Sequence, residues 1–96
     1  MLEKVIEKYL VGQCKKHNIF QRKVAWIGVV GCPDRLLMTP CFTCFVELKA
    51  PDKTPRPSQL REHERLKQAG QVVLTIDTKD KVDELINLIL ERNKND

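Results

Sequence analysis

Residues 42–50 have the sequence FTCFVELKA, which is typical of a β-strand because it is rich in β-branched and aromatic residues and stops at Pro51. Side chains alternate between the two faces of a strand, so Glu47 and Lys49 point the same way. The other face is apolar and consists of Phe42, Cys44, Val46 and Leu48. This alternation predicts a strand that covers a hydrophobic core with one face and carries an acid and an amine on the other, near its end.

A second acid, Asp34, precedes Glu47 by thirteen positions and follows Gly31 and Pro33. Glycine and proline favour a tight turn, which would aim Asp34 at a fixed point. Two carboxylates that converge on one point repel each other, and a divalent cation relieves that repulsion. With Lys49 beside them, the pattern predicts a magnesium site with a catalytic lysine. The alternative is that Asp34 merely belongs to a turn and that Glu47 and Lys49 form a solvated pair on an edge strand.

The composition indicates a single globular domain that comprises residues 1–96. Of the 96 residues, 42% are hydrophobic and 31% are charged, as in ordinary globular proteins. The net charge of +4 favours anionic partners, whereas an aromatic content of 5% argues against a platform on which bases stack. The apolar stretches are too short to cross a membrane, and the N-terminal residues mix both charges unlike a signal peptide. We therefore expect a cytoplasmic protein.

The hydrophobic pattern predicts seven elements in the order αβββαβα. We expect helices at 2–12 or one turn longer, at 57–69 and from 78 onward, and strands at 23–29, 35–38, 42–50 and 71–76. The proline-rich segment 51–57 should be a loop, because proline disrupts regular structure. The tail at 92–96 should fray.

The four cysteines allow two interpretations. Cys14 and His17 are three positions apart, as are Cys41 and Cys44, and zinc sites use such spacings. Residues three apart on a strand face opposite ways, however, so the second pair could chelate together only across a turn. We therefore favour cysteines that act as small hydrophobic residues, with a zinc-stabilised interaction domain as the alternative.

The order of elements and several short motifs resemble the VRR-NUC domain, the virus-type replication-repair nuclease module of the PD-(D/E)XK superfamily. The matching positions are Ile6-Glu7, Lys23, Gly31-x-Pro33-Asp34-Arg35, FVELKA at 45–50, Pro57-x-Gln59, His63-x-x-Leu66 and Gly70-x-x-Val73. The resemblance extends from residue 2 to about residue 90. It implies an α/β fold in which a small mixed β-sheet of the restriction-endonuclease type is flanked by helices.

The resemblance also implies a metal-dependent endonuclease that acts on branched DNA in a phage or its bacterial host. Single-domain members would resolve four-way (Holliday) junctions as homodimers. Asp34, Glu47 and the backbone carbonyl of Leu48 would bind Mg²⁺, for which Mn²⁺ could substitute. Lys49 would hold the attacking water or stabilise charge on the phosphorus, and Gln59 would contact the scissile phosphate or the water.

Glu7 is the helix-borne acid that the resemblance assigns to a second metal position or to orienting the attacking water. Glu3 lies on the same helix face and is the rival candidate. In the alternative interpretation, Glu7 is an ordinary surface residue paired with Lys4 or Lys8.

Four basic residues are candidates for contacts with DNA phosphates: Lys23, Lys53, Arg61 and Arg65. Arg61 and Arg65 are four positions apart and share a helix face, which suits phosphate contacts. Glu62 and Glu64 interleave with them, so a merely solvated helix face is the alternative. No segment resembles a helix that reads bases, so specificity should be for DNA shape.

Two questions stay open from the sequence. A nucleic-acid-binding module that keeps the nuclease fold without catalysis is an alternative function, although the repelling acids Asp34 and Glu47 argue against a retired site. The homodimer would need an apolar surface, which Trp26, Ile27 and Val29 could provide. Alternatively, Trp26 packs inside the monomer against the first helix.

Overall fold

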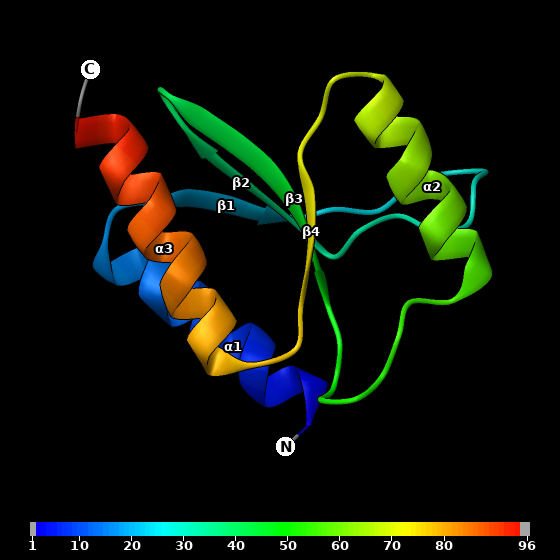
Figure 1. The fold of residues 1–96 in the computed structure, drawn as a ribbon, viewed down its shortest axis with the longest axis horizontal. Helices are drawn as coiled ribbons and strands as arrows, with labels where there is room; N and C mark the ends of the chain where they lie inside the picture. Colours follow the sequence, from blue (N-terminus) through cyan, green and yellow to red (C-terminus); the bar gives the residue numbers. More distant parts are fainter. Residues whose placement is uncertain (1, 95–96) are drawn as a thin grey trace.

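The computed structural model describes residues 2–94, and these form seven elements in the predicted order. They are α1 (Glu3–Lys16), β1 (Phe20–Lys23), β2 (Arg35–Thr39), β3 (Phe42–Leu48), α2 (Pro57–Gln68), β4 (Val73–Ile76) and α3 (Lys79–Lys94). The strands form one sheet in the order β1-β2-β3-β4 (Figure 1). The pairs β1–β2 and β2–β3 are antiparallel, whereas β3 and β4 are parallel, so the sheet is mixed.

The hydrophobic core lies on one face of the sheet, between the strands and the pair of helices α1 and α3 (Figure 1). The predicted apolar face of β3 is confirmed, because Cys44, Val46 and Leu48 are buried there and Phe42 packs against them. The helices contribute Ile6, Leu10, Cys14, Val82, Leu85, Ile86 and Ile89. These residues recur at the three- and four-residue spacing that places side chains on one side of a helix.

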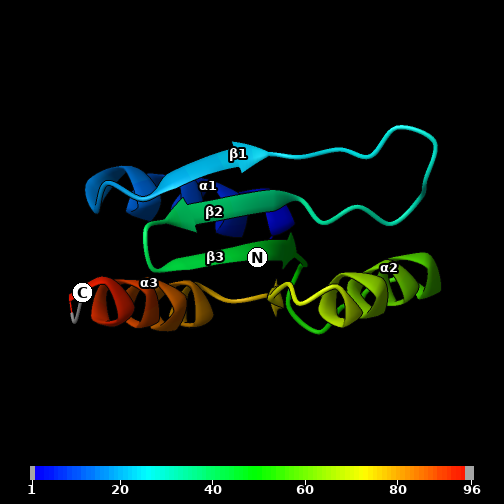
Figure 2. The same ribbon diagram turned by 90° about the horizontal axis from the view of Figure 1, so that it is seen from above.

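The opposite face of the sheet belongs to α2, which lies apart from α1 and α3 (Figures 1 and 2). Phe45 and Glu47 lie on this face because they alternate with the core residues of β3. The parallel pairing of β3 with β4 requires a crossover connection, and α2 is part of it. The connection between the two strands thus brings a helix over Glu47.

The first strand is shorter and earlier than predicted, because β1 covers Phe20–Lys23 rather than 23–29. Its pairing ends where β2 begins, at the pair Lys23 and Arg35. The apolar residues that follow therefore have no neighbouring strand, and the side chain of Ile27 is fully exposed. Gly28 and Gly31 have φ angles of +83° and +107°, which a regular strand does not allow.

The other boundaries agree within a few residues, except that the C-terminal tail is helical instead of frayed as far as the described residues extend. The Asn93 side-chain amide donates to Thr39 Oγ1 and to the Ile89 carbonyl, each at 2.8 Å. Its carbonyl oxygen accepts from the backbone N–H of Cys41 at 3.2 Å, which ties α3 to the β2–β3 turn. Residues 95 and 96 lie outside the described residues. None of the helices described between residues 2 and 94 combines the length and hydropathy that crossing a membrane requires.

Gly31 allows the loop between β1 and β2 to approach the backbone of α2 closely, because it has no side chain. A Cβ atom at this position would lie 2.4 Å from the carbonyl oxygen of Ser58. We expect Gly31→Ala to lower the free energy of unfolding by roughly 2 kcal/mol or more, through this clash and its positive φ.

Gly28→Ala is the matched control, because Gly28 also has a positive φ but its Cβ would meet nothing within 4 Å. It should lose only about 1 kcal/mol, the cost of the backbone conformation alone. Urea denaturation of both variants measures the difference, and equal losses would contradict the close approach to Ser58.

Candidate active site

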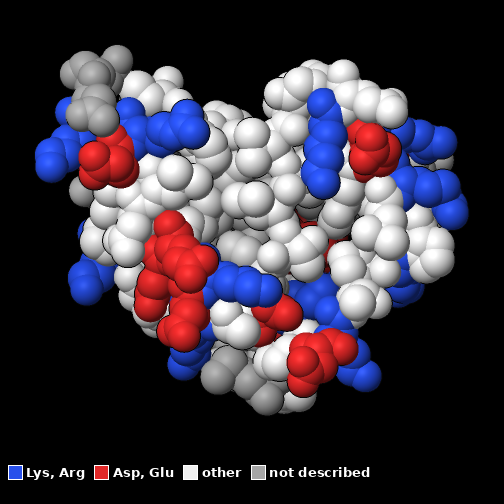
Figure 3. Space-filling model, in the orientation of Figure 1, with Lys and Arg blue, Asp and Glu red and all other residues white. Residues whose placement is uncertain are grey.

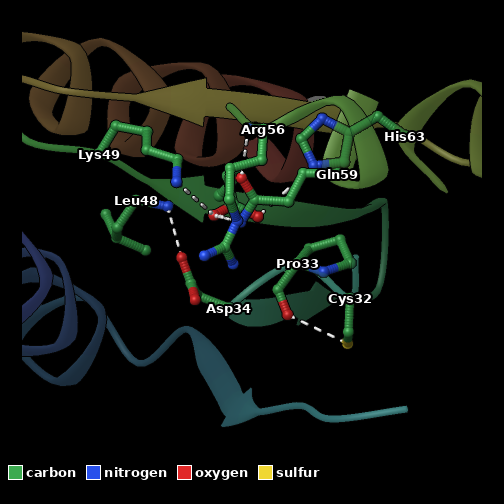
Figure 4. A network of polar contacts seen from close by, with 9 residues as sticks. Cys32, Pro33, Asp34, Leu48, Lys49, Arg56, Gln59 and His63 are labelled. Atoms are coloured by element: carbon green, nitrogen blue, oxygen red, sulfur yellow. Dashed lines mark hydrogen bonds and ion pairs between the residues drawn. The ribbon is translucent and has the colours of Figure 1, made fainter. Parts of the chain in front are cut away.

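Asp34 and Glu47 lie at the same end of the sheet, because β2 starts and antiparallel β3 ends there. Asp34 directly precedes β2, and its backbone N–H donates to the Val46 carbonyl at 3.0 Å. Its Oδ2 atom accepts the backbone N–H of Leu48 at 2.7 Å (Figure 4). The predicted turn thus holds the Asp34 carboxylate against the strand that carries Glu47.

Glu47 is buried, with only 1% of its surface exposed. Its Oε2 atom accepts a hydrogen bond from Gln59 Nε2 at 2.9 Å and lies 3.8 Å from Lys49 Nζ. Burial and the nearby charge of Asp34 raise the pKa of Glu47 to about 8, against the opposing effect of Lys49. The sequence-based expectation that two repelling carboxylates meet beside a lysine is therefore matched by the geometry.

Gln59 connects α2 to this site from the first turn of the helix. Its Oε1 atom accepts the backbone N–H of Arg56 at 2.8 Å, which fixes the side-chain amide so that Nε2 faces Glu47. Gln59 is thus engaged within the protein, and its exposed fraction is 6%. In Figure 4 the side chain of Arg56 extends across the same site.

His63 is a site residue that the sequence did not indicate beyond its place in a family motif. Its Nε2 atom lies 3.5 Å from Glu47 Oε1. The signal that could have found it is its spacing, because residues four apart share a helix face and Gln59 precedes it by four.

The donor set suits a small hard cation. Two carboxylates, Asp34 and Glu47, adjoin each other, and the Glu47 Oε1 atom is buried without a hydrogen-bond partner. Mg²⁺ takes oxygen ligands and keeps several waters, so it needs only a few protein atoms. Among residues 2–94, no group of three or more His, Cys, Asp or Glu side chains comes together to hold a metal ion, so the acids form a pair.

Comparison with known proteins agrees with this geometry. No family model matches the chain. The chain is 43% identical over 79 residues to the "Putative nuclease p44" of Acyrthosiphon pisum secondary endosymbiont phage 1, covering 81% of this chain and 85% of that protein. A solved structure described as a VRR_NUC domain superposes with a TM-score of 0.80 at 34% identity, covering 88% of this chain and 94% of that one.

The chain belongs to the VRR-NUC family. The resemblance noted from its motifs is therefore confirmed, and so is the fold of a mixed sheet flanked by helices.

In this VRR-NUC domain the predicted helix acid Glu7 is not gathered with the other two carboxylates. Its Oε2 atom accepts a hydrogen bond from Arg35 Nε at 3.0 Å, and Arg35 Nη1 donates to Gln21 Oε1 at 3.1 Å. Glu7 is therefore neither free nor paired with Lys4 or Lys8.

The rival acid Glu3 affects the pKa of Glu47. Its negative charge raises that pKa, although its effect is smaller than those of burial, Asp34 and Lys49. Of the two rival acids, Glu7 is thus engaged by Arg35, whereas the charge of Glu3 reaches Glu47.

The alternative of a structural zinc site is wrong. Cys14 and Cys44 lie in the hydrophobic core, where burial raises their thiol pKa values to about 11 and about 12. Their neighbours there are apolar side chains, so neither thiol has a further ligand beside it with which to complete a tetrahedral site. The absence of a three-residue ligand group among residues 2–94 points the same way.

The four predicted DNA-contacting residues are all exposed: Lys23, Lys53, Arg61 and Arg65. Lys23 ends β1, at the sheet edge opposite β4, whereas the other three belong to α2 or to the loop that enters it. Arg65 Nη1 lies 3.5 Å from Glu62 Oε1. Figure 3 shows lysine and arginine atoms around α2, while acidic atoms gather over part of α3. Basic side chains thus flank α2, although others lie at the far end of α3.

The loop of residues 24–34 packs Trp26 against β3 and exposes its tip. The Trp26 ring meets the Phe45 ring edge-on, with centroids 5.9 Å apart. Trp26 therefore packs inside the monomer as in one of our two alternatives, but against β3 on the α2 side rather than against α1. Ile27, Val29 and Val30 stay exposed.

The raised pKa of Glu47 predicts how stability depends on pH without metal. An unfolded glutamate has a pKa of about 4.3, so the folded protein binds this proton more tightly than the unfolded chain. Stability from this group is complete below the unfolded pKa and is lost as pH rises through the folded pKa of about 8.

We therefore expect the wild-type Tm, measured in a chelator, to fall relative to that of Glu47→Gln between pH 5 and pH 8.5, by about 5 °C or more. Titrating groups that do not contact Glu47 are common to both proteins and cancel in the comparison. A Tm difference that does not change with pH would contradict the raised pKa.

Proposed function

We propose that this VRR-NUC domain is a divalent-metal-dependent endonuclease that hydrolyses phosphodiester bonds in branched DNA. The observation that carries the proposal is the meeting of Asp34 and buried Glu47 at one end of the sheet, with Lys49 beside them. Membership of a family that includes the phage protein named "Putative nuclease p44", which is of similar length, supports it. We further propose that the enzyme acts in the cytoplasm of the bacterial host of a phage.

Asp34, Glu47 and the backbone carbonyl of Leu48 would hold Mg²⁺, and Mn²⁺ should substitute for it. The bound cation supplies positive charge beside the phosphate and makes a water more acidic. A cation would also offset the burial and the charge of Asp34, which together raise the pKa of Glu47 in its absence. Glu7, or its rival Glu3, would orient the attacking water from α1.

In the reaction, a water oxygen attacks the phosphorus, one P–O ester bond breaks and the leaving oxygen gains a proton. Lys49 would stabilise the negative charge that builds up on the phosphate oxygens in the transition state. Gln59 would act through Glu47, because its amide already donates to that carboxylate. Arg56, Arg61, Arg65 and the lysines Lys23 and Lys53 would contact the DNA backbone.

The preferred substrate is proposed to be a four-way junction, recognised by shape and cut by a homodimer. Two matched cuts require two active sites related by a two-fold axis. The exposed apolar tip of the loop, with Ile27, Val29 and Val30, supports an interface between two copies.

Cleavage of labelled flap, splayed-arm and four-way-junction DNA tests the activity. We expect cutting in Mg²⁺ or Mn²⁺ and none in a chelator. Asp34→Asn and Glu47→Gln should abolish cutting while the proteins stay folded. Lys49→Ala should lower the rate at least about a hundredfold with little loss of DNA affinity, because its contribution lies in the transition state.

Lys8→Ala is the matched control, since Lys8 is an exposed lysine on α1, and it should cut like the wild type. If Asp34→Asn cuts as fast as the wild type, the site assignment is wrong. If Lys49→Ala loses affinity as much as rate, Lys49 is only a phosphate anchor.

Light scattering at micromolar concentration tests the dimer. We expect a mass twice the 11.1 kDa of the chain, and about 11.1 kDa for Ile27→Asp, because a buried charge would oppose the interface. A wild-type mass near 11.1 kDa with junction cutting intact would remove the dimer and the paired cuts together.

A further inference from the structure

The buried face of α2 is polar, which is unusual for a helix that packs against a sheet. The helix buries two residues, Gln59 and His63, one turn apart. Surface helices normally bury an apolar stripe, and the gain from burying these two side chains is small unless they find partners. Both side chains point at Glu47, one toward each of its carboxylate oxygens.

The two contacts differ in length, and only the shorter one is a hydrogen bond. Gln59 Nε2 makes a hydrogen bond of 2.9 Å to Glu47 Oε2, whereas His63 Nε2 stays 3.5 Å from Glu47 Oε1. Both atoms of the longer contact are buried and without a hydrogen-bond partner among residues 2–94. A pair of buried unpartnered polar atoms that face each other costs free energy, and a small shift would satisfy both.

His63 can act on Glu47 but not on a substrate. It is 5% exposed, and the Glu47 carboxylate adjoins its Nε2 atom. Its Nε2 atom faces Glu47 Oε1, and a histidine ring can carry a proton on this nitrogen. A bound cation would keep Glu47 ionised, and an ionised carboxylate can only accept hydrogen bonds, so the ring must then carry a proton on Nε2 to bond with it.

We propose that His63 is a positioning residue whose Nε2–H closes onto Glu47 Oε1 when a divalent cation binds beside Asp34. Gln59 and His63 then hold the two carboxylate oxygens from one helix and fix the orientation of the carboxylate. This inference rests on the proposed function, because it requires the cation. Groups that orient a metal ligand in this way commonly change metal affinity by 10–100-fold.

Isothermal titration of the DNA-free protein with Mn²⁺ tests the proposal through a pair of variants of similar shape. We expect His63→Met, which lacks a donor, to bind Mn²⁺ about 10–100-fold more weakly than the wild type. His63→Gln retains an N–H donor and should bind within about threefold of the wild type. The control is the other histidine, and His17→Met should bind like the wild type.

Each outcome is decisive. If the wild type binds Mn²⁺ and His63→Met binds it equally well, His63 only packs and the inference is overturned while the proposed function stands. If His63→Gln is as weak as His63→Met, a donor does not matter and the inference is also overturned. A wild type that neither binds Mn²⁺ nor cuts DNA overturns the proposed function and this inference together.

A measurement on the wild type does not depend on the folding of variants. Long-range ¹H–¹⁵N correlation spectra report which ring nitrogen of a histidine carries the proton. With saturating Mg²⁺ we expect His63 to be protonated on Nε2, and protonation on Nδ1 alone would overturn the proposal.

Discussion

The burial of the Glu47 carboxylate beside Asp34 is the constraint on which the α2 side of this protein depends. An ionised carboxylate in a water-poor setting is costly unless it is paired and hydrogen-bonded, and a second acid nearby raises that cost. Two neighbours of Glu47 offset this cost, the Lys49 ammonium and the Gln59 amide. The backbone N–H of Leu48 donates a hydrogen bond to the Asp34 carboxylate. Burial and the charge of Asp34 nevertheless raise the pKa of Glu47 to about 8.

The sheet separates the buried carboxylate of Glu47 from the hydrophobic core, which stabilises the fold. The apolar core lies between the sheet and the pair α1 and α3, and none of its residues comes from α2. Hydrophobic burial on one face can therefore stabilise the fold while the other face keeps polar groups that serve chemistry. The strand β3 belongs to both, because Val46 and Leu48 face the core and Glu47 lies between them on the other side.

The loop of residues 24–34 leads to Asp34 at the same end of the sheet. It is tied to the sheet by the Trp26–Phe45 contact and approaches α2 at Gly31, where no side chain would fit. Pro33 is buried, and Asp34 then joins the ladder through its backbone. This entry into β2, with the hydrogen bonds of Asp34 to Val46 and Leu48, holds the Asp34 carboxylate beside the strand that carries Glu47.

The sequence alone determined the order of the elements, the two faces of β3 and the proximity of Asp34, Glu47 and Lys49. These follow from local periodicity, from turn chemistry and from the alternation of side chains along a strand. Only the tertiary structure decided that β1 ends at Lys23, because a strand lasts only as long as its neighbour pairs with it. It also decided that Arg35 engages Glu7 and that Gln59 and His63 converge on Glu47. The spacing of Gln59 and His63 places them on one face of α2, but the residues that this face meets depend on how the helices cover the sheet, which no local pattern encodes.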